Sequence, residues 1–323
     1  MGKLFFKRGI RMRRFIPILI ALSLFIALLI YIDISKVIEA IKSADLRVLF
    51  LAFLISNLTM LLRTLKWKVM LRGVGISELL PVQILGMGIS NLTPGKIAEP
   101  VKALILKASS GIPVSASLPT IIWERVNDLL VLLCFALLSF FYLRFGAINY
   151  FVILLFLLVI ALALLVIYSE SFGRRVFNFI RKARVRISED FIRSFYKSRP
   201  EPKLVFLSFL LTIIVWILDG IVFSLALISL GNEANFLAIT SLWALSLLLG
   251  LASSLPGGIA SSDAAMIFLL TPLGTSVAKS AASVLIARAI TLGYSLLVGV
   301  VSFVYLSHKI GGEFKRIVKE VFK

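Results

Sequence analysis

Long apolar runs alternate with short basic segments along most of the chain. Several runs reach the length of about 17 residues or more that a helix needs to cross a bilayer. They occupy residues 15–32, 46–62, 126–143, 148–168, 204–230, 236–255 and 277–306. The pattern therefore predicts an all-α, polytopic transmembrane bundle with about seven or eight crossings.

The segment 33–47 follows a different period. Ile34, Val37, Ile38 and Ile41 fall at i, i+3, i+4 and i+7, the spacing of one apolar face on a helix. Charged residues occupy other positions of the same segment. This arrangement predicts an amphipathic helix that lies in the membrane interface.

Two stretches, 76–123 and 256–275, break the pattern of long runs. Proline and glycine divide them into short apolar pieces. Broken backbone at membrane depth is tolerated only where it is buried in protein or lines a wet cavity. We therefore expect broken, re-entrant helices in both stretches.

The composition supports a membrane protein. Hydrophobic residues make up 60% of the chain and charged residues 16%, which excludes an ordinary soluble globular protein. Basic residues flank the apolar runs, and 25 of the 35 Lys and Arg lie in four segments: 1–14, 63–72, 170–203 and 309–323. Such placement marks cytoplasmic loops. We expect a multi-pass protein of the cell membrane with both termini in the cytoplasm, and no nucleic-acid partner.

Cysteine and histidine are too scarce for most catalytic chemistry. Cys134 and His308 are the single residues of their types, so the chain can form no internal disulfide, no cysteine metal site and no Ser-His or Cys-His pair. An aspartyl protease would need a carboxylate dyad, but neither Asp219 nor Asp263 lies in the glycine-x-glycine-Asp setting expected there. We expect no enzymatic activity, no metal and no cofactor.

The two halves of the chain share an ordered set of features. Pro94-Gly95 precedes Arg125 by about 31 residues, and Pro256-Gly257 precedes Arg288 by about 32, each with an acidic residue in between. The predicted orientations of the matching spans are opposite. We expect a single membrane domain, 1–323, with inverted repeats at about 46–168 and 204–306 and a basic cytoplasmic loop at 170–203. Chance repetition of a Pro-Gly pair is the alternative.

The first candidate substrate-binding group surrounds the first break. Its members are Asn91, Pro94, Gly95, Lys96 and Glu99. A half-helix that begins after Pro-Gly leaves free backbone N–H groups that attract anions such as phosphate. Lys96 adds a positive charge and can pair with Glu99 at i, i+3. An interfacial turn with a surface ion pair is the alternative interpretation.

Further charged candidates lie at the start of a span, within a span and at the second break. They are Glu124, Arg125, Asp128, Asp219, Pro256, Gly257, Gly258, Asp263 and Arg288. Helical spacing lets Arg125 face Asp128 at i, i+3. Charges within a span usually face a cavity or a partner, although a purely structural salt bridge is equally compatible with the pattern.

The ordered motifs resemble the family of lysylphosphatidylglycerol synthase transmembrane regions, also called UPF0104 or flippase-like. The resemblance rests on Arg63-x-x-Lys66-Trp67-Lys68, Pro94-Gly95-Lys96-x-x-Glu99, Glu124-Arg125-x-x-Asp128, Leu255-Pro-Gly-Gly258 and Arg288. It implies movement of an aminoacylated phospholipid between leaflets, without the soluble synthase domain. Lys96 stands where the family usually has Arg, and Asp263 follows serines where glycine and glutamate are usual, so the lipid is left open.

Two functions are compatible with these features. A lipid translocase would bind the phosphate of an anionic or aminoacylated phospholipid through Lys96, Arg125 and Arg288. It would bind a cationic headgroup through Glu99, Asp128, Asp219 or Asp263. The alternative is a non-transporting membrane partner of a lipid- or polyprenyl-linked glycosylation or lipid-modification enzyme, docking through 170–203. Either protein could be a homo-oligomer or act beside a separate lipid-modifying enzyme.

Overall fold

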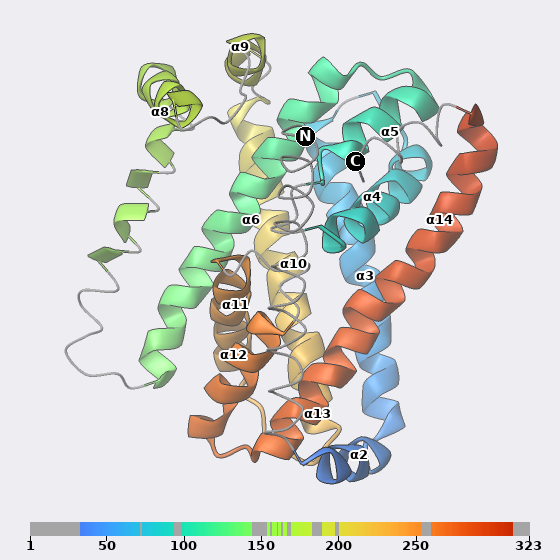
Figure 1. Ribbon diagram of the computed structural model, residues 1–323, viewed down its shortest axis with the longest axis vertical. Helices are drawn as coiled ribbons and strands as arrows, with labels where there is room; N and C mark the ends of the chain where they lie inside the picture. Colours follow the sequence, from blue (N-terminus) through green and yellow to red (C-terminus); the bar gives the residue numbers. More distant parts are fainter. Residues whose placement is uncertain are drawn as a thin grey trace, which may run out of the picture.

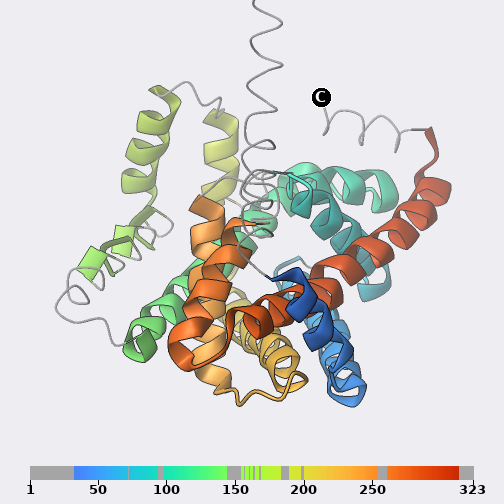
Figure 2. The same ribbon diagram turned by 60° about the horizontal axis from the view of Figure 1, so that its bottom comes forward.

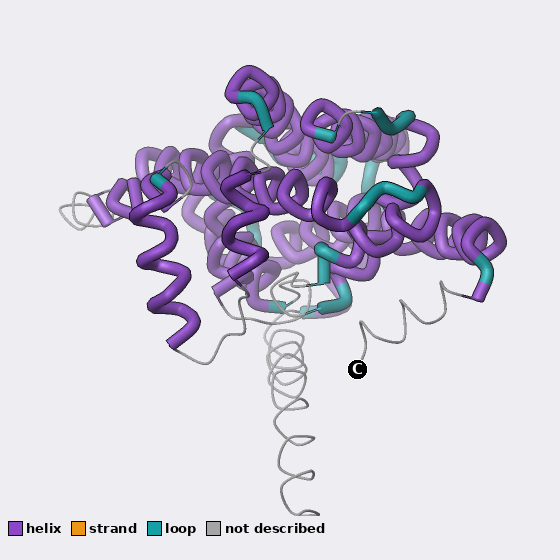
Figure 3. Tube along the Cα trace, turned by 90° about the horizontal axis from the view of Figure 1, so that it is seen from above, coloured by secondary structure: helices purple, strands orange, loops and turns teal. Residues whose placement is uncertain are grey.

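A computed structural model describes residues 33–71, 73–93, 98–143, 154–166 (without 156, 160 and 163), 169–182, 189–197, 200–252 and 260–312. Within these ranges the chain is helical, with short connections and no strand, as predicted (Figure 3). Five sequence predictions lie outside these ranges: the span 15–32, the tail after 312, Pro94-Gly95, Lys96 and the turn Pro256-Gly257-Gly258.

The described helices follow one another along the chain, joined by short connections. They are α2 (Ile34–Lys42), α3 (Leu46–Met70), α4 (Ile76–Asn91), α5 (Val101–Ser110), α6 (Val114–Leu143), α8 (Glu170–Lys182), α9 (Glu189–Lys197), α10 (Pro202–Ile228), α11 (Phe236–Ala252), α12 (Ser261–Leu270), a short 3-10 turn (Thr271–Leu273), α13 (Val277–Arg288), a π-helical turn (Ala289–Gly293) and α14 (Tyr294–Ile310).

Four helices in the described part are long and apolar enough to cross a membrane. They are α3, α6, α10 and the continuous rod Val277–Ile310, which runs from α12 across the bundle to α5 (Figure 2). A fifth crossing is possible if Leu157–Val166 and the start of α8 form one span, bent by 103°. This count is compatible with the predicted seven or eight crossings.

Two pairs of short helices flank the predicted breaks. Helices α4 and α5 pack together in the upper half of the bundle, and α11 and α12 pack together in the lower half (Figure 1). The sequence predicts a full span at 236–255, and α11 is described from Phe236 to Ala252 within it. One pair of short helices thus lies toward each end of the bundle.

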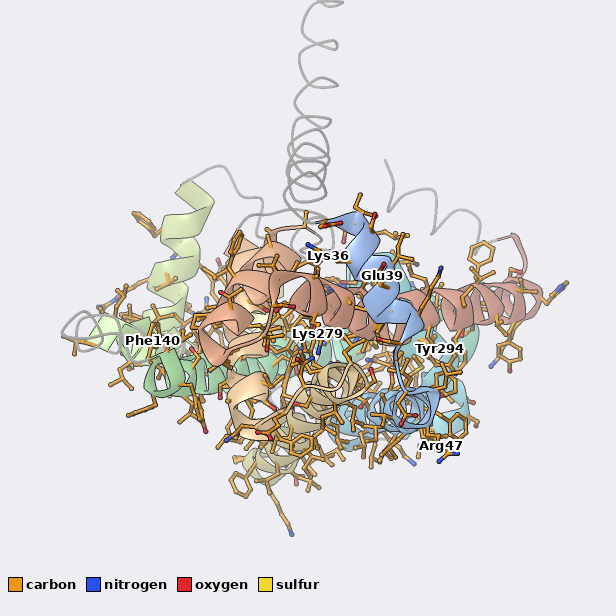
Figure 4. All side chains as sticks on the ribbon, turned by 90° about the horizontal axis from the view of Figure 1, so that it is seen from below. Lys36, Glu39, Arg47, Phe140, Lys279 and Tyr294 are labelled. Atoms are coloured by element: carbon orange, nitrogen blue, oxygen red, sulfur yellow. The ribbon has the colours of Figure 1, made fainter. Side chains whose placement is uncertain are left out.

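The predicted interfacial helix is present as α2. Its N-cap is Asp33, and hydrogen bonds from the side chain and then the backbone of Lys36 hold the pKa of that carboxyl below its usual range. Val37 is buried against the bundle, whereas Ile38 is exposed. Figure 4 shows Lys36 and Glu39 on α2 at the lower end of the bundle. An apolar face left open in this position suits the boundary between headgroups and acyl chains.

The apolar core is divided, and this division positions the polar site. One cluster joins α10, α11, α12 and α13, with Leu242 and Met266 fully buried. A second joins α3, α4, α5 and the start of α6, with Trp67 and Leu79 fully buried. The buried charged side chains of the bundle lie among the helices that carry these two clusters.

Candidate functional site

Lys66 links α3 to α6 in the interior of the bundle. Its Nζ lies 2.6 Å from Asp128 Oδ1 and 3.4 Å from Glu124 Oε1, and the lysine side chain is completely buried. Glu124 and Asp128 are one turn apart on α6, so both carboxylates face α3. A buried ammonium is tolerated only with such compensation, because an unpaired charge in low dielectric is very costly.

Lys102 provides a second buried cation, from α5. Its Nζ lies 2.8 Å from Glu99 Oε1 and 3.0 Å from Glu124 Oε2, and it donates to Gln83 Oε1 over 3.0 Å. The ammonium also lies 4.8 Å from the centre of the Trp67 ring, within the range of a cation–π contact.

Gly86 on α4 makes room for this lysine. A Cβ atom at position 86 would lie 2.1 Å from Lys102 Cγ, far inside van der Waals contact. The absence of a side chain on α4 therefore lets the lysine stem pass from α5 toward α6.

Arg125 on α6 completes the cluster. It pairs with Asp128 over 2.8 Å, with Glu99 over 3.0 Å and with Glu124 over 3.5 Å. Its side chain is 34% exposed, unlike those of the carboxylates that it contacts. Three cations and three carboxylates thus form a formally neutral group, which we call the α3–α5–α6 charge network (Lys66, Glu99, Lys102, Glu124, Arg125 and Asp128).

A separate ion pair joins α3 to α10. A guanidinium nitrogen of Arg63 donates to Asp219 Oδ2, and the guanidinium lies 5.2 Å from the centre of the Trp216 ring. The same indole donates through Nε1 to Asp128 Oδ1 over 3.2 Å. Trp216 therefore lies between the Arg63–Asp219 pair and the charge network.

The second half of the chain has its own ion pair near the second break. Arg288 Nε on α13 lies 2.7 Å from Asp263 Oδ1 on α12, and its guanidinium also donates to Ser262 Oγ. Asp263 Oδ2 accepts the backbone N–H of Ala260 over 3.2 Å at the start of α12. Arg288 lies 5.0 Å from the centre of the Trp243 ring. A carboxylate in the first turn of a helix also interacts favourably with the helix dipole.

A cavity of about 120 Å³ lies among the long helices and the short helices of both halves, with room for several water molecules. Its polar lining comes from Ser56, Thr59, Arg63, Ser90, Asn91, Glu99, Arg125, Asp219, Thr291 and Ser295. Its apolar lining comes from Met60, Met87, Trp216, Val222, Phe223, Trp243, Leu247, Ala287 and Leu292. The cavity is lined by both halves, and its charged groups come from α3, the turn before α5, α6 and α10.

The predicted site residues that the structure describes fall into three groups. Those that line the cavity are Asn91, Glu99, Arg125 and Asp219. Glu124 and Asp128 lie in the charge network that holds Arg125. Asp263 and Arg288 form their own pair, next to the cavity-lining Trp243. The remaining members, Pro94, Gly95, Lys96, Pro256, Gly257 and Gly258, lie outside the described residues.

Sequence reasoning misses part of the site. Arg63, Lys66 and Lys102 are not among the predicted site residues. Arg63 and Lys66 belong to the basic stretch 63–72, which is typical of a cytoplasmic flank. The i, i+3 spacing of Arg63 and Lys66 places them on neighbouring positions of one helix face. This spacing is the feature of the sequence that could have indicated Arg63 and Lys66 as site residues. The described residues contain no group of three or more His, Cys, Asp or Glu that could hold a metal ion.

Comparison with known proteins places the chain in a family. A family profile described as the lysylphosphatidylglycerol synthase TM region matches residues 16–299. The chain belongs to this family. Its relatives within the lysylphosphatidylglycerol synthase TM region family include a UPF0104 membrane protein of Methanothermobacter thermautotrophicus, 25% identical over 91% of this chain and 96% of the relative.

A second relative gives the same assignment. A UPF0104 membrane protein of Pyrococcus horikoshii is 24% identical over 89% of this chain and 96% of its own length. Both names describe membrane proteins and state no reaction. Together with the long apolar helices, the family establishes an integral, multi-pass membrane protein.

Proposed function

We propose that this protein is a lipid translocase that moves the polar headgroup of a phospholipid or lipid-linked compound between leaflets while the acyl chains remain in lipid. The observation that carries the proposal is the cavity, which is lined by both halves of the chain and contains Arg63, Glu99, Arg125 and Asp219. Charged side chains within spans are costly, and in membrane proteins they commonly mark substrate pathways.

Two arginines of the cavity are suited to a phosphate. Arg125 keeps a third of its side chain exposed, and Arg63 also lines the cavity, so both guanidinium groups can offer planar donor pairs to phosphate oxygens. Lys96 lies three residues before Glu99 in the sequence and is a further candidate for this role.

The acids of the charge network have a supporting role in this mechanism. Lys66, Arg125 and Trp216 already contact Asp128, and its side chain is only 5% exposed. It is therefore better suited to orienting Arg125 than to binding a cationic headgroup directly, the role considered from the sequence. Arg288 contacts the cavity-lining Trp243, so its role in phosphate binding depends on movement of that ring or of α13.

The repeated architecture supports alternating access. Each half places an acid after its broken region and pairs it with an arginine on the following long helix: Glu99 with Arg125, and Asp263 with Arg288. The helix pairs α4–α5 and α11–α12 lie toward opposite ends of the bundle (Figure 1). We interpret them as the two broken elements of an inverted repeat, the arrangement in which transporters bind substrate between halves.

Transport in reconstituted vesicles tests the proposal. Purified protein is inserted into vesicles that contain fluorescent phospholipid, and exposure of the label to an impermeant quencher is followed over time. We expect the wild-type protein to accelerate flipping and Arg125→Ala or Arg288→Ala to abolish it at normal expression. Arg175→Ala, on the exposed side of α8, is the control and should transport normally. Unchanged flipping in both arginine variants would refute the proposal.

Helices α8 and α9 support the second candidate, a non-transporting partner of a lipid-modifying enzyme. Helix α8 stands apart from the long helices (Figure 2) and leaves Phe179 exposed. Deletion of most of 170–203 discriminates between the two functions. Transport should survive the deletion if the protein is a translocase, whereas association with the enzyme should fail if these helices form a docking surface.

A further inference from the structure

The cavity is lined by hydroxyl groups as well as by charges. Ser56 and Thr59 contribute hydroxyls from α3, and Thr291 and Ser295 contribute them from the rod that contains α13 and α14. Ser56 Oγ donates to a backbone oxygen of the π-helical turn in this rod over 3.3 Å. The four hydroxyls therefore belong to two long helices that are in direct contact.

The protons of these hydroxyl groups are already used within the protein. Thr59 Oγ1 donates to the backbone oxygen of Ile55 over 2.9 Å, and Thr291 Oγ1 donates to that of Ala287 over 2.7 Å. Ser295 Oγ donates to the backbone one turn before it, over 2.8 Å. A hydroxyl group has one proton and two lone pairs, so its remaining capacity is that of an acceptor. This part of the cavity is therefore suited to a ligand group that donates hydrogen bonds.

These acceptors continue the face of α3 that carries Arg63. Ser56, Thr59 and Arg63 follow one another at intervals of three and four residues. At the rise of a helix, the two hydroxyls lie about 6 and 10 Å from Arg63 along the axis. A guanidinium has five N–H donors, and the bond from Arg63 to Asp219 uses one of them, so a phosphate can bind Arg63 beside this carboxylate. The rest of the headgroup then extends along the hydroxyls.

The carboxylates that line the cavity are already engaged, which disfavours an amine as the donating group. Glu99 pairs with Lys102 over 2.8 Å and with Arg125 over 3.0 Å. Asp219 pairs with Arg63 and has a further interaction within the protein. A protonated amine would have to displace one of these cations or lie among neutral acceptors with its charge uncompensated. A neutral hydroxyl group donates to the same acceptors without this cost.

We infer that the lipid headgroup is a phosphate that carries a neutral polyol, such as glycerol or a sugar. The phosphate binds at Arg63 and Arg125, and hydroxyl groups of the polyol donate to Thr59, Thr291 and Ser295. Each of them reproduces the hydrogen bond of a water molecule in the same place, so little is lost when the headgroup displaces that water. This inference rests on the proposed lipid translocation and differs from the aminoacylated headgroup that the family resemblance implies.

The first test compares phosphatidylglycerol with phosphatidylpropanol in reconstituted vesicles, each lipid labelled on an acyl chain. The propyl group keeps the phosphate, the charge and the three-carbon length but lacks both hydroxyl donors. The wild-type protein should flip phosphatidylglycerol about tenfold faster, the scale of two hydrogen bonds. Phosphatidylethanolamine should also be flipped more slowly than phosphatidylglycerol. Equal rates for phosphatidylglycerol and phosphatidylpropanol would overturn the inference, as would fastest flipping of phosphatidylethanolamine.

Variants of the hydroxyl groups locate the preference in the cavity. Thr59→Val with Thr291→Val removes two acceptors and keeps the side-chain shape, so it should lower the ratio of the two rates about fivefold or more. Thr59→Ser with Thr291→Ser keeps the hydroxyls and should retain the ratio. Thr212→Val is the matched control, because Thr212 is buried on α10, donates to the backbone oxygen of Ser208 over 2.7 Å and lies outside the lining of the cavity. An unchanged ratio in the folded valine variant would contradict the inference, and either single valine variant gives the same test with a smaller change if the double variant does not fold.

Soluble headgroups separate this inference from the proposed transport. Glycerol 3-phosphate should raise the thermal unfolding temperature of the wild-type protein more than propyl phosphate or phosphoethanolamine at the same concentration. The double valine variant should lose this difference. If the wild-type protein flips none of the three lipids, the translocase proposal fails, and the polyol site is then tested by these shifts alone. Equal shifts with glycerol 3-phosphate and propyl phosphate would overturn it.

Discussion

Lys66 Nζ lies 2.6 Å from Asp128 Oδ1 although the two residues are 62 positions apart in the chain and almost entirely buried. This contact connects α3 to α6 where both helices have charged side chains inside the bundle. It makes the charge network a structural element of the fold as well as the support for Arg125.

Replacement of Lys66 tests the structural importance of the network. Lys66→Met keeps most of the side-chain length but leaves Asp128 and Glu124 with one cation fewer. We expect a loss of about 3–5 kcal/mol in the free energy of unfolding, the scale observed when one partner of a buried ion pair is removed. Denaturant unfolding of the purified protein in detergent measures the loss.

The matched control for this substitution is Lys68→Met, two residues further along α3 and partly exposed. We expect its effect to stay within about 0.5 kcal/mol, as for most surface substitutions. Equal destabilisation by the two variants would show that the network does not depend on Lys66.

The predicted spans end where charges begin, whereas the observed helices continue through them. The sequence predicts spans at 46–62 and 126–143, but α3 extends to Met70 and α6 begins at Val114. Hydropathy treats each charge as if it were exposed to lipid, so a window that contains Lys66 or Glu124 loses its apolar signal. In the structure these charges neutralise one another, and a helix can therefore carry them within the bundle.

The fold class and the approximate positions of the spans follow from the sequence because lipid requires long apolar helices. The partners of the charges cannot be predicted in the same way. Helical spacing predicts that Glu99 pairs with Lys96 at i, i+3, a pair that lies outside the described residues. Among the described residues Glu99 pairs with Lys102 and with Arg125. Arg125 lies 26 positions away from Glu99 in the chain, and only the packing of α5 on α6 brings the two together.

Gly86 offers a test of the path taken by Lys102. Gly86→Ala places a methyl group where Lys102 Cγ now lies, so the lysine stem or α4 has to move. We expect a loss of about 1–3 kcal/mol in stability, the usual cost of overpacking a well-packed interior. The thermal unfolding temperature in detergent provides the measurement.

Gly299→Ala on α14 is the control for this change, because a Cβ at position 299 meets no atom within 4 Å. It should be neutral or slightly stabilising, since alanine has the higher helix propensity. If Gly86→Ala proves as stable as Gly299→Ala, the stem of Lys102 does not pass against Gly86.

Trp216 has two separable roles, and a single substitution distinguishes them. Trp216→Phe retains an aromatic face for Arg63 but removes the indole N–H that donates to Asp128. We expect a loss of about 1.5–3 kcal/mol, the range for a hydrogen bond to a charged group. Trp243→Phe is the control, because the Trp243 ring faces Arg288 in the same way. It measures the stability lost when an indole is replaced by a smaller ring, and we expect this loss to be smaller than that of Trp216→Phe. Equal unfolding midpoints for the two variants would contradict a role of the indole N–H.

The orientation in the membrane can be tested by chemical labelling, because Cys134 is the single cysteine of the chain. Cys134→Ala provides a background without cysteine, and Ser43→Cys and Lys309→Cys then place single thiols at the end of α2 and near the end of α14.

The two helix ends lie toward opposite ends of the bundle (Figure 1). The last part of α3, which carries Arg63, Lys66 and Lys68, lies toward the same end of the bundle as α8, α9 and the close of α14 (Figure 1). This end should be cytoplasmic by the positive-inside rule. In intact cells a membrane-impermeant maleimide should therefore label Ser43→Cys, and it should label Lys309→Cys only after permeabilisation. The reverse pattern would invert the proposed orientation, and labelling of both thiols from outside would contradict an odd number of crossings between α2 and the end of α14.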